Sequence, residues 1–513
     1  MIRVGIDVGG TNTDAVIMER AQVVHWVKTP TTADVMGGVL KALELVLGES
    51  GLSPERIGAV MIGTTHFTNA IVQRRDLAPT AAIRLGLPAT QALPPMVDWP
   101  EDLRRALGEH IYLAHGGFEF DGRPISPLDP LELRKIAEDI KAKGVRNVAI
   151  SAVFSPINPK IEVEAARIVR EVIPDAQITL SSEIGRIGLL ERENAAILNA
   201  SLQDLGYKIV RAFSQALRDA GISAPFYLTQ NDGTLMSADF AEKFPVLTIA
   251  SGPTNSMRGA AFLSGIKEAI VVDVGGTTTD VGALHHGFPR EASIAVEVGG
   301  VRTNFRMPDV FSLGLGGGSI VQRDPLKIGP ESVGFRLTEE AWVFGGGTLT
   351  ATDIAVAAGM AEVGDAQRVQ GLDPTFVEAA VERMQQMIAD AVDRMLLSPE
   401  PIPVIVVGGG SILVRDKVGN LPTIKPDHYP VANAVGAAIA QISGEVDRVY
   451  ALANIPREKA LEEARREAKQ RAVEAGADPS TVEIVEVEDV PLAYLPGNAT
   501  RIRVKAVGDL RLA

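Results

Sequence analysis

An eight-residue stretch with the composition of a phosphate-binding loop occurs twice in the chain. Residues 7–14 read DVGGTNTD and residues 273–280 read DVGGTTTD, so only the sixth position differs. Paired glycines let a backbone turn tightly and present consecutive N–H groups to an anion, and threonine hydroxyls add further donors. An acidic residue directly before such a turn would repel phosphate unless a divalent cation lay between them. We therefore expect Asp7 and Asp273 to be ligands of Mg²⁺.

The separation of the two copies indicates a duplicated architecture. They lie 273 − 7 = 266 residues apart, about half of the 513-residue chain, so each half should begin a domain with the same unit. Each copy follows an apolar run, which predicts a unit of strand, Gly-Gly turn and strand. One copy alone could be an ordinary hairpin turn, but the repetition favours two loops that close on one nucleotide from opposite sides.

The residues of the two loops fall into two groups by expected role. The candidate catalytic residues are the aspartates at the loop ends: Asp7, Asp14, Asp273 and Asp280. The candidate nucleotide-binding residues are Gly9, Gly10, Thr11, Asn12, Thr13, Gly275, Gly276, Thr277 and Thr278.

Further glycine clusters fit a nucleotide site. An apolar strand, Val404–Val407, runs into a glycine turn, which is where open α/β sheets bind ligands. The expected adenosine contacts in that turn are Gly408, Gly409 and Gly410. Two weaker clusters, residues 313–319 and 344–348, could serve either close packing or ligand contact. From the first of these we include Gly316 and Gly317 among the candidate nucleotide contacts.

The composition restricts the chemistry and the location. Absence of cysteine excludes disulfides, thiolate catalysis and cysteine-ligated metals. The 50 Lys and Arg against 64 Asp and Glu give a formal charge of −14, which argues against a broad grip on nucleic acid. The first seven residues lack the pattern of a secretory signal, and no apolar run is long enough to cross a bilayer. We expect a cytoplasmic protein that binds neither nucleic acid nor membrane.

The sequence resembles the hydantoinase A/5-oxoprolinase family, within the superfold of actin, sugar kinases and heat-shock chaperone ATPases. Besides the two aspartate loops and the late glycine turn, the resemblance rests on residues 63–70 (GTTHFTNA), 191–200 (ERENAAILNA), 231–237 (NDGTLMS), 251–253 (SGP) and 432–438 (ANAVGAA). It runs in the family's order from residue 1 to about residue 440 and is typical of a short subfamily. It implies an α/β fold with two ribonuclease H-like, actin-like ATPase lobes around an ATP cleft, and ATP and Mg²⁺ as cofactors.

The family segments supply weak candidates for substrate contacts. These are Thr65, His66, Asn69, Glu191, Arg192, Glu193 and Asn194. For His66 a solvent-facing loop is the alternative, and for the four residues that begin the helix the alternative is a set of ordinary solvated charges. The chain also departs from the family where relatives often read SGPAGG: Thr254, Asn255 and Ser256 follow Pro253 here. The ligand contact of that loop is therefore an open question.

Apolar periodicity and turn residues predict four parts of the chain. They are an N-terminal lobe at 1–180, a helical bridge at 181–225, a second lobe at 226–445 and an α+β appendage at 446–513. A helix at 186–220 should form the bridge, and a helix at 433–442 should return to the first lobe. The appendage should hold a helix at 457–475 and strands at 482–487 and 500–507, and it could cap the core, bind a partner or form an oligomer. His285 and His286 should face opposite sides of a strand and so not chelate a metal together.

The resemblance implies ATP-dependent opening of a cyclic amide such as a lactam, a hydantoin or 5-oxoproline. Water attacks a resonance-stabilised amide slowly, and phosphorylation of the amide oxygen would supply a good leaving group. In the family a second, hydantoinase B-like subunit often completes hydrolysis, so we expect such a partner. One alternative is an ATP-dependent, ketone-activating carboxylase subunit, which bicarbonate dependence would reveal. An alternative of another class is an actin-like or chaperone-like nucleotide switch.

Overall fold

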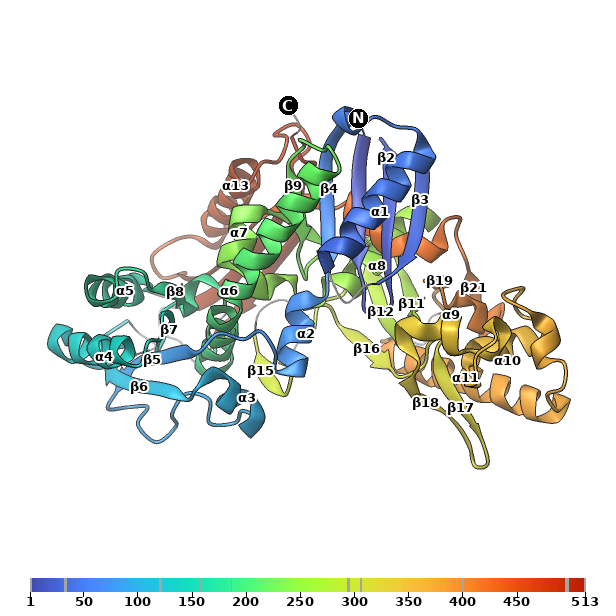
Figure 1. Ribbon diagram of the computed structural model, residues 1–513. Helices are drawn as coiled ribbons and strands as arrows, with labels where there is room; N and C mark the ends of the chain where they lie inside the picture. Colours follow the sequence, from blue (N-terminus) through green and yellow to red (C-terminus); the bar gives the residue numbers. More distant parts are fainter. Residues whose placement is uncertain are drawn as a thin grey trace.

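The computed structural model describes residues 2–31, 35–119, 122–156, 158–185, 187–292, 296–304, 307–397, 401–493 and 498–511. It is a mixed α/β structure built on two large sheets and one smaller one, with helices on their faces (Figure 1).

The first large sheet has nine strands in the order β23-β24-β22-β10-β9-β4-β1-β2-β3. Its strands are β1 (Ile2–Val8), β2 (Asn12–Glu19), β3 (Gln22–Pro30), β4 (Ile57–Thr64), β9 (Phe226–Thr229), β10 (Thr234–Ser237), β22 (Gln441–Ala451), β23 (Glu483–Pro491) and β24 (Ala499–Gly508). Strands β1, β4 and β9 are parallel, whereas β2 pairs antiparallel with β1 and β3 pairs antiparallel with β2. Helix α1 (Val35–Ser50) covers one face and α12 (Ala432–Ala438) the other, which explains why β1 is apolar almost throughout.

The smaller sheet is fully parallel and lies beside the first. Its order is β6-β5-β7-β8, formed by β5 (Thr80–Leu87), β6 (His110–His115), β7 (Asn147–Ala152) and β8 (Gln177–Leu180). Helices α4 (Pro130–Ala142) and α5 (Lys160–Val172) bury their apolar sides against it. Helix α3 (Glu101–Leu107) precedes β6. This part occupies the lower left of Figure 1.

The second large sheet has the order β13-β12-β11-β19-β21-β20, with β16 beside β12. Its strands are β11 (Ala269–Val274), β12 (Thr279–His285), β13 (Phe288–Pro289), β16 (Val310–Leu313), β19 (Val404–Val407), β20 (Lys417–Val418) and β21 (Leu421–Ile424). Helices α10 (Ala351–Ala357) and α11 (Pro374–Met395) pack on one face, and α8 (Ser251–Ser264) packs on the other. The other short elements of this part are β17 (Ser319–Arg323), β18 (Leu326–Ser332) and α9 (Leu337–Glu340). Strands β14 (Val296–Val298) and β15 (Val301–Thr303) form a separate two-stranded ribbon that packs against α2 (His66–Gln73) and α6 (Leu189–Asp219) and joins the core of the first sheet.

Three helices connect these sheets. The 31-residue helix α6 (Leu189–Asp219) contacts β7 of the small sheet and α1 of the first large sheet, so it bridges them. Residue 186, where the predicted helix begins, lies outside the described residues. Helices α8 and α12 touch backbone to backbone, because a Cβ at Gly436 would lie 1.8 Å from the carbonyl oxygen of Asn255. Two short helices, α2 (His66–Gln73) and α7 (Ala238–Lys243), complete the set around α6.

The sheet topology differs from the predicted boundaries at both ends of the second lobe. Strands β9 and β10 belong to the first sheet although they lie in the range 226–445, and the predicted helix at 433–442 ends at Ala438 because β22 begins at Gln441. A strand of four residues carries too little pattern to reveal which sheet it joins, since pairing is decided by tertiary contacts. The division into lobes therefore remains a proposal.

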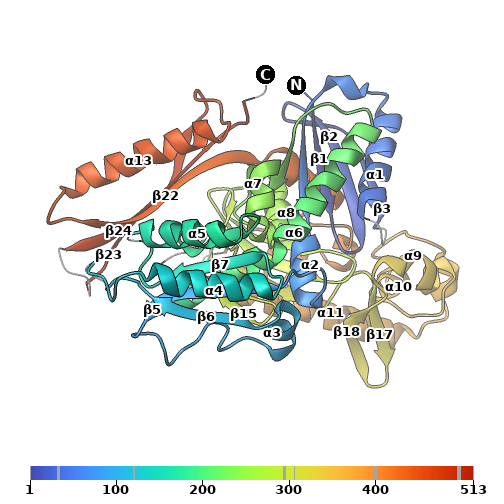
Figure 2. The ribbon, with the colours of Figure 1, turned by 60° about the vertical axis from the view of Figure 1, so that its left-hand side comes forward.

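The C-terminal residues extend the first sheet. Strands β22, β24 and β23 continue it, and helix α13 (Arg457–Glu474) lies along them, as Figure 2 shows. Alanines at four-residue spacing, Ala460, Ala464, Ala468 and Ala472, form the buried side of α13. The helix and both strands predicted for the tail are present, but their sheet is shared with the N-terminus, so the expected separate appendage is replaced by an extension of the first sheet.

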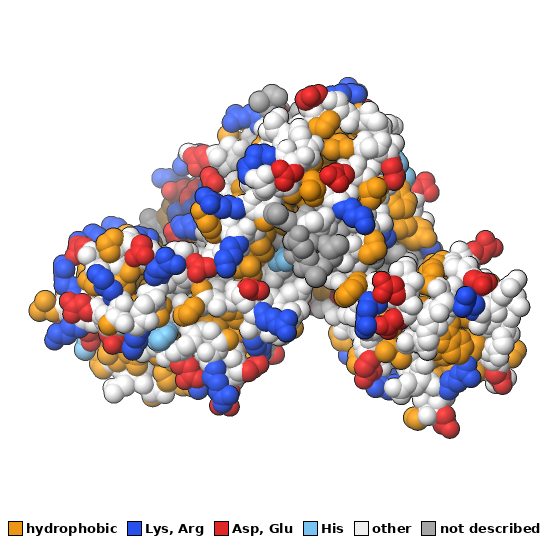
Figure 3. Space-filling model, viewed as in Figure 1, with side chains coloured by type: hydrophobic (Ala, Val, Ile, Leu, Met, Phe, Trp, Pro, Cys, Tyr) orange, Lys and Arg blue, Asp and Glu red, His pale blue; other side chains and the backbone are white. Residues whose placement is uncertain are grey.

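Two surface properties bear on function. In the described part of the chain, no helix combines the length and apolar character needed to cross a membrane. Figure 3 shows acidic and basic side chains mixed over the visible face, with a notch between the part built on β5–β8 and the part that carries β17 and β18.

Candidate active site

The two aspartate loops form the same hairpin in each large sheet. Asp7 pairs with Asp14 across β1 and β2, and Asp273 pairs with Asp280 across β11 and β12. Each turn is closed by one backbone bond: Gly9 N–H donates to the Asn12 carbonyl at 3.0 Å, and the Gly275 N–H makes the equivalent bond at 2.9 Å. The predicted unit of strand, Gly-Gly turn and strand is therefore confirmed in both halves.

The two turns meet face to face. The hydroxyl oxygens of Thr11 and Thr277 lie 3.4 Å apart, and a Cβ at Gly276 would stand 2.7 Å from the Thr11 side chain. Between them lies a cavity of ≈ 440 Å³. The predicted residues that line it are Asp7, Gly9, Gly10, Thr11, Asn12, Asp14, Thr65, Asp273, Gly275, Gly276, Thr277, Thr278, Asp280, Gly317, Gly408, Gly409 and Gly410. Residues 266 positions apart in sequence thus form one site.

The carboxylates of the cavity are held in a desolvated environment. Burial raises the pKa of Asp7 to about 6, against hydrogen bonds from Asn255 and Asn433 that lower it, and Asp14 and Asp273 add repulsion. Burial also raises the pKa of Asp280 to about 6, and that of Asp273 is raised for the same reason. Asp7 and Asp14 are buried, and Asp273 and Asp280 are partly buried. Carboxylates gathered in this way favour a cation that would relieve their mutual repulsion.

Sequence reasoning missed a lysine in this cavity. Lys28 on β3 lines the cavity and places Nζ 2.6 and 2.7 Å from the two carboxylate oxygens of Asp14. Asn433 at the start of α12 donates to Asp7 at 3.0 Å and to Asp14 at 2.9 Å. The strand β3 carried no motif, so only its pairing with β2 could have indicated Lys28.

The loop that departs from the family pattern contacts both expected metal ligands. Asn255 donates to Asp7 Oδ1 at 3.2 Å and to the Thr229 hydroxyl at 3.0 Å, while Ser256 hydrogen-bonds Asp273 and lines the cavity. The side-chain amide oxygen of Asn255, Oδ1, is buried with no hydrogen-bond partner among the described residues. An orphaned buried acceptor beside Asp7 suits a donor such as the water shell of a bound cation.

The glycine turn after β19 packs against the second aspartate loop. Gly408 has φ of 90°, and a Cβ there would stand 2.3 Å from an Asp273 carboxylate oxygen. The cluster 313–319 supports the same loop from another side: Gly317 N–H donates to the Gly275 carbonyl at 3.0 Å, and Gly316 packs on Gly276 without lining the cavity. In this cluster, therefore, Gly317 contacts the cavity, whereas its neighbour Gly316 serves only packing.

Of the first group of predicted substrate residues, Thr65, His66 and Asn69, only Thr65 lines the cavity. Thr65 donates to the Val8 carbonyl at 3.1 Å. His66 instead hydrogen-bonds the Thr64 hydroxyl through Nδ1, and burial lowers its pKa to about 4. Asn69 is exposed, and neither His66 nor Asn69 is among the described residues that line the cavity. Thr13, a predicted nucleotide-binding residue, is also absent from the cavity lining, and its hydroxyl lies 3.4 Å from that of Thr31.

The second group, Glu191 to Asn194, lies away from the cavity and is used in the fold. Glu193 accepts a two-point contact from the buried Arg84 and a hydrogen bond from Ser151 at 2.5 Å. Arg192 is fully buried and donates to the Ala152 carbonyl at 2.5 Å. Asn194 accepts a hydrogen bond from Trp99 Nε1 and donates one to the Arg302 carbonyl on β15. The Glu191 carboxylate lies 3.5 Å from the Arg302 guanidinium. The solvated-charge alternative is wrong for Arg192 and Glu193, since both are buried.

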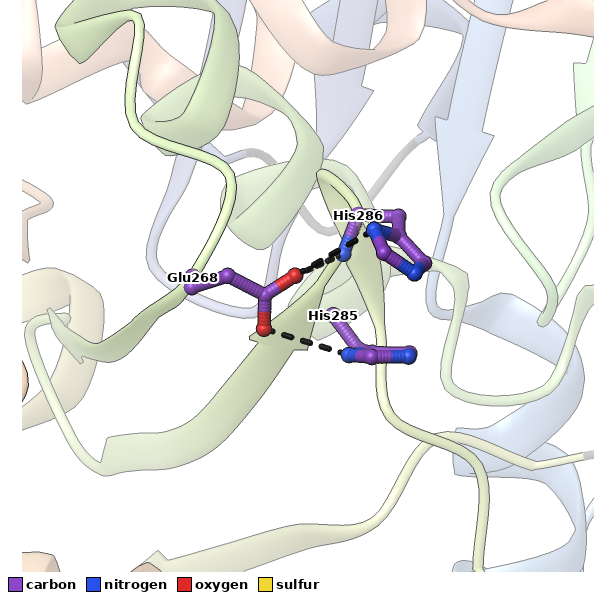
Figure 4. A group of neighbouring side chains, drawn as sticks. All are labelled: Glu268, His285 and His286. Atoms are coloured by element: carbon purple, nitrogen blue, oxygen red, sulfur yellow. Dashed lines mark hydrogen bonds and ion pairs between the residues drawn. The ribbon is translucent and has the colours of Figure 1, made fainter. Parts of the chain in front are cut away.

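The expectation for the adjacent histidines is also wrong. Strand β12 ends at His285, and His286 adopts a left-handed conformation with φ of 53°, so the alternation of a strand stops there. Both histidines lie beside Glu268, as Figure 4 shows. Their ring centroids are 4.0 Å apart. His285 and His286 are therefore close enough to bind one metal ion together, contrary to the expectation from the sequence.

The cavity fits a magnesium–nucleotide complex by its donor set. Its carboxylates offer the oxygen ligands that Mg²⁺ prefers, and the two Gly-Gly turns offer backbone N–H groups and hydroxyls to phosphates. Asp7 and Asp273 lie directly before the two turns, where they would hold the ion against the phosphates.

Comparisons with known proteins were consistent over most of the chain. The model of the hydantoinase/oxoprolinase N-terminal region matches residues 3–173, and the hydantoinase/oxoprolinase model matches residues 192–485. Caprolactamase subunit alpha of Pseudomonas jessenii is 28% identical over 417 residues, which cover 76% of this chain and 58% of the relative. The acetophenone carboxylase gamma subunit of Aromatoleum aromaticum is 28% identical over 395 residues, which cover 69% and 53%.

Two solved structures share the fold. The ATP-dependent caprolactamase from Pseudomonas jessenii matches with a TM-score of 0.78 at 19% identity, covering 99% of this chain and 88% of that chain. Nucleotide-free acetone carboxylase matches with a TM-score of 0.72 at 19% identity and the same coverage. These matches confirm the predicted fold class and, at such identity, show the fold alone.

The relatives are longer than this chain, which spans 58% and 53% of the two named above. Family models nevertheless match both halves, and the conspicuous motifs of both halves converge on one cavity. The chain belongs to the hydantoinase/oxoprolinase family.

Proposed function

We propose that the chain is the ATP-dependent subunit of a cyclic amide hydrolase and phosphorylates the amide oxygen of its substrate. The observation that carries this proposal is the pairing of two near-identical aspartate hairpins across one cavity. Such an arrangement suits a nucleoside triphosphate with Mg²⁺, because carboxylates, backbone N–H groups and hydroxyls converge there. Membership of the family supports an amide as the acceptor.

The chemistry requires transfer of one phosphoryl group. The γ-phosphoryl group moves to the amide oxygen and ADP leaves, which gives an imidate phosphate with an electrophilic carbon. Water then adds to that carbon, and the ring C–N bond breaks as the leaving nitrogen takes up a proton, which opens the ring to an acyl phosphate. A second water hydrolyses the acyl phosphate to a carboxylate and inorganic phosphate. Bound Mg²⁺ would neutralise charge on the phosphoryl group during transfer.

The residues of this chain would contribute orientation and charge. The two Gly-Gly turns would hold the phosphates, and Asp7 and Asp273 would hold the ion. Lys28 would reach the phosphates from β3, because its Nζ faces the same cavity. Asn255 and Asn433 would fix the carboxylate of Asp7, since both donate to it. Fixed donors and charges in a desolvated site supply most of the rate in phosphoryl transfer.

The test is ADP release by the purified chain, alone and with a hydantoinase B-like protein. A panel of 5-oxoproline, hydantoin and larger lactams should contain at least one compound that stimulates ADP release. The stimulation should disappear in Asp7→Asn and Asp273→Asn, with unchanged circular dichroism. Absence of stimulation by every amide would contradict the proposal.

A second candidate is activation of a ketone for carboxylation, and one specific observation favours it. One of the relatives is the acetophenone carboxylase gamma subunit. The same cavity could phosphorylate an enolate or bicarbonate oxygen. ADP release that requires bicarbonate together with a ketone, and ignores amides, would identify this activity.

We also propose a partner subunit. Both named relatives are themselves described as subunits, and this chain spans little more than half of each. The partner would complete hydrolysis after phosphoryl transfer. Co-expression of the chain with a hydantoinase B-like protein, followed by affinity purification, should recover a stable complex.

A further inference from the structure

Two histidines and a glutamate converge at the end of β11 and β12 that is opposite the phosphate loop (Figure 4). His285 Nδ1 lies 3.1 Å from Glu268 Oε2, and His286 Nδ1 lies 3.4 Å from Glu268 Oε1. We propose that Glu268, His285 and His286 bind one Zn²⁺ ion or a divalent transition metal ion of similar ligand preference.

The ligand spacing suits a tetrahedral ion. Zn²⁺ binds imidazole nitrogen and carboxylate oxygen at about 2.0–2.2 Å, so adjacent ligands in a tetrahedron lie about 3.3–3.6 Å apart. The nitrogen–oxygen separations, 3.1 Å for His285 and 3.4 Å for His286, are measured to different oxygens of the Glu268 carboxylate. One ligand atom from each of the three residues lies within 4.8 Å of the others. Small side-chain rotations would therefore complete the site without a change of backbone.

The backbone around the cluster holds the ligands in place. The last registered pair of the hairpin is Ala269 with Leu284, so Glu268 and His285 are the next residues on the two strands. The His286 N–H donates to Glu268 Oε1 at 2.6 Å and fixes the carboxylate.

The turn itself is tied to two neighbours. Gly287 N–H donates to the Lys267 carbonyl at 2.9 Å, and Arg258 donates to the Gly287 carbonyl at 2.9 Å. A site with restrained ligands loses less conformational freedom on binding an ion.

The site would keep a coordination position open. The three side chains are 53–71% exposed, and both histidines line a cavity of ≈ 420 Å³ between the second large sheet and β23. Strand β11 separates the cluster from the 275–278 turn by six residues, which is about 20 Å at a strand's rise. The ion would therefore clamp the hairpin from the end opposite the phosphates and would not take part in the reaction there.

The experiment is a calorimetric titration of the metal-stripped, full-length protein with ZnCl₂, in the presence of saturating Mg²⁺ and ADP. We expect one Zn²⁺ per chain and a loss of affinity of about 10-fold or more in His285→Ala and in His286→Ala, because losing a residue that merely supports a metal ligand already costs about 10–100-fold. Glu268→Gln should weaken binding too. The matched control is His115→Ala, because His115 is an exposed histidine 3.1 Å from Glu132 without a second histidine in the cluster.

The outcomes separate a built site from general surface affinity. Equal Zn²⁺ affinity in the wild type and in a His285→Ala/His286→Ala double variant would overturn the proposal. So would a loss of affinity in His115→Ala as large as in the cluster variants. Zn²⁺ should also raise the melting temperature of the wild type and leave that of the double variant unchanged, whereas an equal rise in both would count against the site.

Discussion

Lys28 and Asp14 face each other across β2 and β3, and the lysine ammonium contacts both oxygens of the aspartate at 2.6 and 2.7 Å. The Asp14 side chain is 2% exposed, whereas that of Lys28 is 25% exposed and borders the cavity. Lys28 thus supplies a positive charge at the point where two sheets bring four carboxylates together. That charge would be available to a phosphate without movement of the backbone.

Lys28→Met should reduce ADP release at saturating ATP by about 10²–10³-fold, because it removes a fixed charge from the transferring group. Affinity for Mg²⁺ and ADP should change far less, since the turns and aspartates remain. Steady-state kinetics together with calorimetry would measure both. Lys143→Met is the control, as Lys143 forms an exposed pair with Asp139 at 2.6 Å. A Lys28→Met protein with wild-type turnover would remove the lysine from the mechanism.

The raised pKa of Asp7 makes ion binding depend on pH. Its folded value of about 6 exceeds the ordinary 3.8, so the folded protein keeps a proton that the unfolded chain releases between these values. Stability without an ion should therefore fall as pH rises through this window, and Asp280 acts in the same direction. Mg²⁺ binds the carboxylate form only, so the gain in melting temperature from Mg²⁺ with ADP should be small at pH 5 and full at pH 7.5. ADP with EDTA is the control at each pH, and equal gains at both would contradict the prediction.

Asn255 lowers the pKa of Asp7 through its hydrogen bond, against the raising effect of burial. Asn255→Ala should therefore move the acidic limb of the activity profile toward higher pH. Asn147→Ala is a suitable control, because Asn147 is equally buried but donates to the Ala200 carbonyl far from the cavity lining. The control should lower stability without moving the profile. If both variants shift the profile alike, the effect is one of folding and Asn255 has no special role.

The paired loops could be predicted from sequence because their chemistry is local. In each copy a strand, two glycines and flanking aspartates specify a tight hairpin through residues that are adjacent in sequence, and both copies fold as expected. Lys28 could not be predicted, since it matters only through its register opposite Asp14. The burial of Arg192 and Glu193 could not be predicted for the converse reason. Charged residues before an apolar helical segment are typical of a solvated turn, and only the tertiary structure places Arg84 beside Glu193.

The local sequence pattern could likewise not predict which strands join the first large sheet. Strands β9 and β10 are short, and β22 to β24 lie more than 400 residues from β1, yet all belong to one sheet. The alanine stripe of α13 shows why the tail joins it, because small side chains let the helix lie close to β22. A Cβ at Gly444 on that strand would stand 2.2 Å from the Ala468 carbonyl oxygen.

Glu193 should act on stability and not on substrate binding. Removing its charge in Glu193→Gln leaves the Arg84 guanidinium buried without a counter-charge, and breaking a buried pair in this way costs about 3–5 kcal/mol. Chemical denaturation should show this loss, while KM for the substrate stays within about twofold in the protein that remains folded. Glu164→Gln is the control, since Glu164 pairs with Arg167 on an exposed helix face. A rise in KM without a loss of stability would restore the substrate role that the family motif suggests.

Gly276→Ala should separate nucleotide binding from folding. A Cβ at this position would stand 2.7 Å from the Thr11 side chain, so the two phosphate turns would have to move apart. Each turn is closed within its own sheet, and for that reason the sheets should remain intact while their mutual approach is lost. We expect affinity for Mg²⁺ and ADP to fall by about 10-fold or more, the range in which misplaced binding groups lose their effect, with a small change in melting temperature of the nucleotide-free protein. Gly347→Ala is the matched control, because a Cβ there meets no atom of the described residues within 4 Å. Nucleotide affinity that survives in Gly276→Ala would mean that the two hairpins do not need to touch, and the proposed two-sided grip on the phosphates would have to be abandoned.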